Sequence, residues 1–132
     1  MSEIITIQKN KVFNLSQAVD LLPLIYRLTE DSSKQVKYLM SCVDALQDKN
    51  SETSLNLQER INLIIERWQN KLERLGVKPK GLWLADFDNG QGYFCWKYPE
   101  TQILFHHGYQ DGFTGRILLR EEDSHENSHS PN

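Results

Sequence analysis

The sequence predicts an α+β fold, in which a long helical hairpin with the pattern of a coiled coil precedes a small three-stranded antiparallel β-meander. Two observations predict it. Apolar residues recur at helical spacing over residues 15–75. All seven glycines of the chain, and nine of its thirteen aromatic residues, lie between Gly76 and Gly115. That composition is typical of short strands joined by tight turns.

The chain of 132 residues is long enough for one domain, which we place at residues 1–120. Within it we expect the helical hairpin at 12–75 and the meander with a glycine-rich closing loop at 82–118. A short strand at 4–7 is expected to add to an edge of the sheet. Residues 121–132 contain no aliphatic or aromatic side chain, so we predict a disordered acidic tail there.

Charge and composition exclude several classes of function. The net charge is −3, and the tail holds four acidic residues without Lys or Arg, so the rest of the chain sums to −3 + 4 = +1. This nearly neutral body argues against nucleic-acid binding. The chain has no run of eighteen apolar residues and no signal-peptide pattern, so we expect no membrane span and a cytoplasmic protein. Cys42 and Cys95 lack the C-x-x-C spacing of a zinc knuckle.

The first helix is predicted to begin at Asn14, with Gln17 completing a capping box and Phe13 packing against Ala18. From there a seam of residues alternates spacings of three and four, as in a heptad repeat. The seam consists of Leu15, Ala18, Leu22, Ile25, Thr29, Ser32, Val36, Leu39, Val43 and Leu46. Pro23 should bend the helix, and a break near residues 29–33 is left open.

The second helix is predicted to start near Asn56, with Glu59 completing a capping box, and to close at Leu75-Gly76-Val77. At 1.5 Å per residue this helix is about 29 Å long, whereas an unbroken first helix to Asp48 is about 51 Å. The shorter helix cannot cover the whole seam of the longer one. Either the first helix breaks, or its uncovered part pairs with another copy of the chain, and we favour a homodimer through the first helix.

Turn residues predict the register of the sheet. Asn89-Gly90 suits a two-residue type I′ turn, which places Phe87 opposite Gly92. A second reversal at residues 99–102 then places Cys95 opposite His106. In this register an aromatic face packs on the helices, and a mixed face carries Asp86, Cys95 and His106.

With these elements placed, the chain resembles the family called domain of unknown function 2203. The resemblance spans roughly residues 12–118 and rests on a few short motifs. They are Phe13-Asn14-Leu15-Ser16-Gln17-Ala18, Leu21-Leu22-Pro23, Leu75-Gly76-Val77, Gly81-Leu82, Asp86-Phe87, Gly92-Tyr93-Phe94-Cys95-Trp96-Lys97, Glu100, Phe105-His106 and Gly112-Phe113-Thr114-Gly115-Arg116. The resemblance implies this fold and a bacterial cytoplasmic setting, and it implies no activity.

Two groups of residues are candidates for a site. Cys95 opposite His106 would form either an activated thiol or two metal ligands, and the alternative is a buried cysteine that only packs. The loop that ends at Arg116 would bind a small anion together with His106, Asp111 and Glu100. The alternative there is that Arg116 pairs with a carboxylate of the same chain, from Asp86, Glu100 or Asp111.

These observations support two hypotheses of different classes. The first is a non-enzymatic, self-associating protein-interaction module. The second is a small-anion or metal-binding protein or enzyme, with its site on the mixed face around Cys95, His106 and Arg116.

Overall fold

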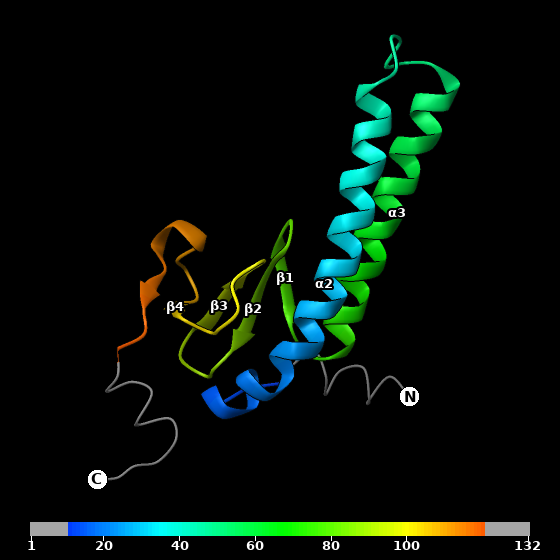
Figure 1. Ribbon diagram of the computed structural model, residues 1–132. Helices are drawn as coiled ribbons and strands as arrows, with labels where there is room; N and C mark the ends of the chain where they lie inside the picture. The colour runs from blue at the N-terminus through cyan, green and yellow to red at the C-terminus, as the bar shows by residue number, and fades with distance from the viewer. Residues whose placement is uncertain (1–10, 121–132) are drawn as a thin grey trace, which may run out of the picture.

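The computed structural model describes residues 11–120, which form two helices followed by a five-stranded antiparallel sheet (Figure 1). The helices are α2 (Leu15–Asp44) and α3 (Glu52–Arg74). The strands are β1 (Lys78–Gly81), β2 (Leu84–Asp88), β3 (Tyr93–Lys97), β4 (Phe105–His107) and β5 (Ile117–Leu118), in that spatial order, with the short helix η1 (Phe113–Gly115) before β5. The predicted α+β class is confirmed, but the sheet has five strands rather than three. The predicted strand at 4–7 and tail at 121–132 lie outside the described residues.

Local capping signals define the start of α2 as predicted. The Asn14 side chain accepts a hydrogen bond from the Gln17 backbone N–H at 2.8 Å, and the Gln17 side chain accepts one from the Asn14 N–H at 2.9 Å. The helix continues without interruption through residues 29–33, so the break does not occur. Figure 1 shows the first turns of α2 at an angle to the rest, in the region where Pro23 removes a hydrogen bond.

The second helix starts earlier than predicted. Its N-cap is Ser51, whose side chain accepts from the Ser54 N–H at 3.1 Å, so the predicted start at Asn56 is wrong. Its end follows the prediction: Gly76 adopts a φ of 85°, and the Val77 N–H donates to the Leu72 carbonyl at 2.9 Å. The polar loop between the helices is held by Lys49, whose ammonium donates to carbonyls at the C-terminus of α2.

The seam of α2 is buried within the chain at most positions from Ala18 to Leu39, whereas Val43 and Leu46 at its outer end are half-buried. With 30 and 23 residues, α2 and α3 are about 45 Å and 35 Å long, and the sheet covers part of the seam that α3 leaves. Thr29, a polar seam position, accepts a hydrogen bond from the Trp68 indole at 2.8 Å. The difference in helix length is therefore smaller than predicted, and the outer end of the seam, at Val43 and Leu46, stays half-buried. The main core comprises Phe13, Ala18, Leu22, Ile25, Trp68, Leu72, Val77, Ala85, Phe87, Phe94, Trp96 and Ile103.

The first hairpin of the sheet is shifted by two residues from the predicted register. Phe87 pairs with Phe94 and Asp88 with Tyr93, because the loop holds four residues, 89–92, and is closed by a hydrogen bond from the Asn89 N–H to the Gly92 carbonyl. A shift of two preserves the faces of a strand. Phe87, Phe94 and Trp96 accordingly face the helices as predicted.

The second hairpin is shifted by one residue, which exchanges the faces of β4. Cys95 pairs with Phe105, and Phe94 pairs with His106. The connecting loop spans residues 98–104 rather than 99–102. Glu100 fixes this longer loop, since its N–H donates to the Lys97 carbonyl at 2.8 Å and its carbonyl accepts from the Trp96 indole.

The two additional strands form the edges of the sheet. β1 lies between the predicted hairpin at 12–75 and the predicted meander at 82–118, and β5 follows the glycine-rich loop. Among residues 11–120, no helix combines the length and apolar character needed to cross a membrane.

Candidate metal centre

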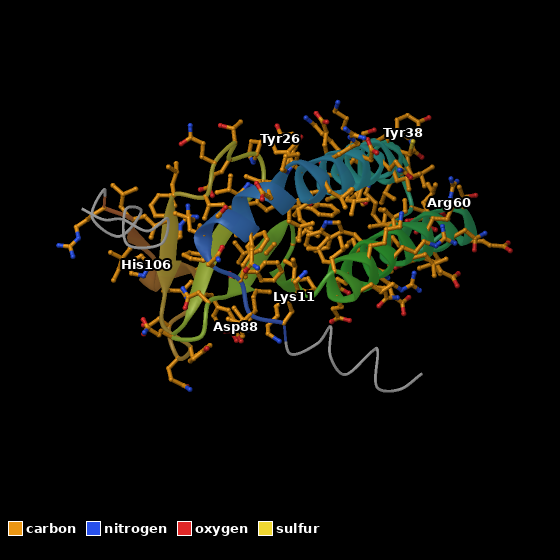
Figure 2. All side chains as sticks on the ribbon, turned by 90° about the horizontal axis from the view of Figure 1, so that it is seen from below. Lys11, Tyr26, Tyr38, Arg60, Asp88 and His106 are labelled. Carbon is orange, nitrogen blue, oxygen red and sulfur yellow. The ribbon has the colours of Figure 1, made fainter. Side chains whose placement is uncertain are left out.

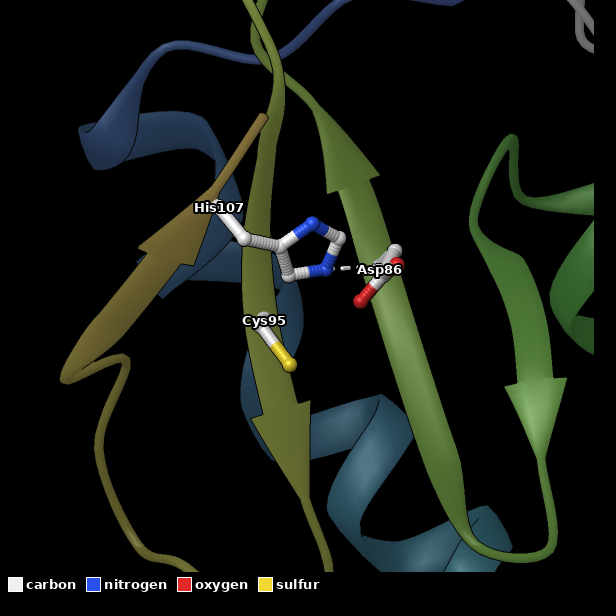
Figure 3. Close-up of side chains that lie close together, drawn as sticks. All are labelled: Asp86, Cys95 and His107. Atoms are coloured by element: carbon white, nitrogen blue, oxygen red, sulfur yellow. Dashed lines mark hydrogen bonds and ion pairs between the residues drawn. The ribbon is translucent and has the colours of Figure 1, made fainter. Parts of the chain in front are cut away.

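Three side chains capable of binding a metal converge on the mixed face of the sheet (Figure 3). Asp86 on β2 pairs directly with Cys95 on β3, so the two side chains point to the same side. His107 on β4 pairs with Tyr93, two residues before Cys95, and therefore shares that side as well. One carboxylate oxygen, the thiol sulfur and one imidazole nitrogen all lie within 4.8 Å of one another.

Hydrogen bonds at both ring nitrogens fix the imidazole of His107. Nδ1 lies 2.8 Å from the Gly108 carbonyl oxygen, which can only accept, so Nδ1 carries a proton. Nε2 lies 3.0 Å from Oδ2 of Asp86. One proton between Nε2 and Oδ2 is enough to form this hydrogen bond, whether it is bound to the nitrogen or to the oxygen. The ring is thereby oriented with Nε2 toward the cluster.

The cluster is buried. The exposed fractions of Asp86, Cys95 and His107 are 2%, 0% and 4%. Oδ1 of Asp86 is, within residues 11–120, the buried side-chain oxygen or nitrogen that lacks a hydrogen-bond partner. Burial raises the pKa of Asp86, and the neighbouring His107 opposes that rise by favouring the charged carboxylate. Besides His107, the Cys95 thiol interacts with Asp86 by side-chain hydrogen bonding, and a bound cation would satisfy the buried carboxylate more strongly than a thiol.

Cys95 does not have the surroundings of a nucleophile. Burial, followed by the negative charge of Asp86, raises the pKa of its thiol to about 12, and the Arg116 guanidinium limits the rise. An activated cysteine needs a base that accepts its proton. Here Nε2 of His107 is engaged by Asp86, and Nδ1 by a carbonyl. The geometry therefore favours a metal ligand over a reactive thiol.

Arg116 lies at the side of the cluster and is held by Glu100. Its two terminal nitrogens donate to the two carboxylate oxygens at 3.2 Å and 2.6 Å. The guanidinium carbon lies 3.8 Å from the ring centroid of Phe105 and 4.3 Å from that of Phe113. Arg116 therefore pairs with a carboxylate of its own chain, which is the alternative stated for this loop, and the partner is Glu100. Glu100 occupies the positions that an external anion would take.

The other predicted site residues lie elsewhere. His106 pairs with Phe94 and is half-buried on the opposite face from Cys95, so the predicted juxtaposition of Cys95 and His106 is wrong. Asp111 is exposed and accepts from the Gly108 N–H at 3.2 Å, which fixes the loop next to His107. Because the predicted register put His106 on the mixed face, it put the adjacent His107 on the aromatic face, and His107 was missed as a ligand. The loop before β4 spans residues 98–104 and so has an odd number of residues, and no signal in the sequence indicated that length.

Most of the chain matches one protein family. The family model described as "Uncharacterized conserved protein (DUF2203)" matches residues 11–119, most of the chain. The chain belongs to the DUF2203 family. The resemblance inferred from the sequence motifs is thus confirmed, and the match includes all three side chains of the cluster. No curated protein and no solved structure matches this DUF2203 chain.

The donor set of the DUF2203 chain suits a transition metal. A sulfur, an imidazole nitrogen and a carboxylate oxygen are all ligands of Zn²⁺, with bonds of about 2.0–2.3 Å. A tetrahedral ion with such bonds holds its ligand atoms about 3.5 Å apart. Small side-chain rotations would bring the three atoms, which now lie within 4.8 Å, to that spacing.

Proposed function

We propose that this protein binds one divalent transition metal of the zinc class through Asp86, Cys95 and His107. The observation that carries the proposal is the convergence of three different donor atoms within 4.8 Å on a buried part of the sheet. Such a donor set is unsuited to Ca²⁺ or Mg²⁺, which prefer oxygen ligands. The mixed face was predicted from sequence to carry the site, and two of its three ligands differ from the predicted pair.

The orientation of His107 supports the proposal. Histidines that bind metals commonly donate the hydrogen of their second nitrogen to a backbone carbonyl or a carboxylate, which fixes the tautomer. His107 has this arrangement, because Nδ1 donates to the Gly108 carbonyl and leaves Nε2 for the metal. The Gly108 N–H is itself bound by Asp111, so the carbonyl belongs to a constrained turn.

Charge balance also supports it. Without a metal, the hydrogen-bonded Asp86 and His107 share one proton in a pair of zero net charge, and the buried Cys95 thiol is neutral. Binding of a divalent ion would release two protons, one from the pair and one from the thiol. The carboxylate and thiolate then carry −2 against +2 on the metal. The buried cluster is neutral in both states, which avoids the cost of burying net charge.

Three protein ligands leave one coordination position of a tetrahedral ion for water or another small ligand. Zinc sites with three protein ligands and an open position are typical of catalysis, whereas structural sites use four. A water molecule on the ion would be the group available for chemistry.

Metal titration of the purified chain tests this proposal. After chelator treatment, we expect one Co²⁺ or Zn²⁺ per chain, with an absorption band from sulfur-to-cobalt charge transfer. Cys95→Ser and His107→Gln should each weaken binding at least tenfold. Cys42→Ser and His106→Gln are matched controls, since Cys42 lies on α2 and His106 on the other face of the sheet, and both should bind as the unmodified protein does.

A contrary result would be clear. If circular dichroism shows that the variants are folded, and His106→Gln loses metal while His107→Gln keeps it, the assignment of ligands is wrong. Absence of stoichiometric binding by the unmodified, folded protein at micromolar metal would overturn the proposed function itself.

Self-association remains a second candidate, and the outer part of the hairpin supports it. The outer arm, residues 33–65, extends beyond the sheet (Figure 1), and Figure 2 shows Tyr38 and Arg60 at the opposite end of the molecule from His106. Several of its apolar residues are only half-buried in one chain. They are Cys42, Val43, Leu46, Leu57, Ile61, Ile64 and Ile65. We propose that a second copy packs on this arm, as in a helical bundle.

Light scattering after size-exclusion chromatography tests this second candidate. At tens of micromolar we expect the mass of a dimer. The double variant Tyr38→Glu/Leu63→Glu, which changes exposed residues of the outer arm, should shift it to the monomer. Leu82→Glu, a similarly exposed position outside the helices, is the control. A monomeric unmodified protein would remove this candidate.

We further propose a cytoplasmic setting, because both cysteines are free thiols, as is usual in a reducing compartment.

A further inference from the structure

Arg116 is held in one position by contacts on several sides. Glu100 accepts one hydrogen from each of the two terminal nitrogens of the guanidinium. The rings of Phe105 and Phe113 lie against its faces at 3.8 Å and 4.3 Å. A guanidinium has five N–H groups, so three remain for other acceptors. Because the Arg116 side chain is only 15% exposed, water can accept few of these remaining hydrogens.

The contacts of Arg116 place it beside the sulfur of Cys95. Phe105, on whose ring the guanidinium lies, is the direct cross-strand partner of Cys95 on β3. Paired residues on neighbouring strands share a face, so Arg116 lies over the position next to the thiol. The guanidinium and the thiol are close enough to interact by charge and by side-chain hydrogen bonding.

Neighbouring groups make this position compatible with a nearby cation. A lone arginine next to a metal ion would repel it. Glu100 neutralises Arg116 through two hydrogen bonds, so the pair adds no net charge next to the cluster. The pair can thus direct an N–H group toward a thiolate without introducing an uncompensated charge.

We propose that Arg116 is a positioning residue for the metal centre. Its guanidinium donates a hydrogen bond to the metal-bound sulfur of Cys95 and is itself fixed by Glu100. This inference rests on the proposed metal binding and adds the second layer of groups around it. A hydrogen bond to a thiolate ligand withdraws charge from the sulfur and stabilises it against protonation. Partners of this kind typically contribute tenfold to a hundredfold to metal affinity.

Cobalt spectroscopy tests the inference with a signal that a purely structural role would not change. In Arg116→Gln we expect Co²⁺ affinity to fall tenfold to a hundredfold, and the sulfur-to-cobalt band to move to longer wavelength, because the sulfur lone pair has lost its donor. Arg116→Lys keeps the charge but not the planar fork, and it should give an intermediate band position. Glu100→Gln should weaken binding because Arg116 loses both its anchor and its neutralising charge.

Lys97→Gln is the matched control. Lys97 lies on β3 two residues after Cys95 and is exposed, so this change removes a positive charge close to the site without removing the proposed donor. It should leave affinity and band unchanged. If the unmodified protein binds Co²⁺ and Arg116→Gln and Arg116→Lys both keep its band, the inference is overturned even if affinity falls. If the unmodified protein shows no stoichiometric binding, this inference falls with the proposed function.

Discussion

The two cysteines differ in their surroundings, and a thiol reagent should distinguish them. Cys95 is fully buried and its pKa is raised to about 12, whereas Cys42 on α2 is half-exposed. A raised thiol pKa means that the reactive thiolate is absent at and below pH 10. We expect iodoacetamide to modify Cys42 in the folded, metal-free protein and to leave Cys95 unmodified from pH 7 to pH 10. Peptide mass spectrometry measures this, and rapid modification of Cys95 would contradict the described surroundings.

Gly92 is a second residue whose replacement should have a distinct effect. A Cβ atom there would lie 2.4 Å from the backbone oxygen of His107 and 3.1 Å from Cα of Gly108. Because both neighbours are backbone, β4 would have to move, so Gly92→Ala should destabilise the fold by about 1–3 kcal/mol. Gly112→Ala meets nothing within 4 Å and is the control. Urea unfolding measures both, and equal stabilities would show that β3 and β4 are not in this close contact.

The candidate site was predictable only in part. The sequence placed Asp86 and Cys95 on one face, because a strand alternates sides whatever its register. It assigned His106 instead of His107, because the loop after Lys97 was taken as a short turn. The real loop is set by contacts of Glu100 with Trp96 and Lys97 and by burial of Ile103. Those are tertiary contacts, which turn propensities do not contain.

Among the elements, the loop between the helices offers a direct test of capping. Lys49 donates to the carbonyls of Val43 and Asp44 at 3.1 Å and 2.8 Å, in the last turn of α2, whose carbonyls lack a helical N–H donor four residues on. Lys49→Met should therefore lower stability by about 0.5–1 kcal/mol. Lys37→Met, at an exposed position on α2, should change it less. Thermal unfolding of the two variants compares them, and equal melting temperatures would contradict the capping role.

Two local signals were predictive, whereas the local capping box expected at Asn56 was wrong, and elements that depend on partners were missed. The capping box at Asn14 and the close at Gly76 involve residues a few positions apart, and both are found as predicted. β1 has two lysines, a proline and a glycine, which are poor strand formers. It forms because its backbone pairs with β2 at the edge of the sheet. β5 has only two residues, too few for any periodic signal.

At the scale of the whole molecule, stability should differ along the hairpin. The inner turns of α2, at Ala18, Leu22 and Ile25, are buried in the main core, whereas in the outer arm few side chains are fully buried. Amide hydrogens of the outer arm should therefore exchange faster than those of residues 18–25. Hydrogen exchange with mass spectrometry at low micromolar concentration measures this. Equal protection would show that another contact covers the arm.

The order of the elements along the chain has a consequence for biosynthesis. Within residues 11–120, the ribosome releases both helices before any strand, so the two helices of the outer arm can pair while the apolar inner turns of α2 still lack the aromatic residues that cover them. Of the three proposed ligands, His107 emerges last, and its strand closes the sheet against β3. The nascent chain thus exposes the apolar inner turns of α2 until the sheet has been synthesised, and the proposed three-ligand site cannot be complete before His107 has been translated.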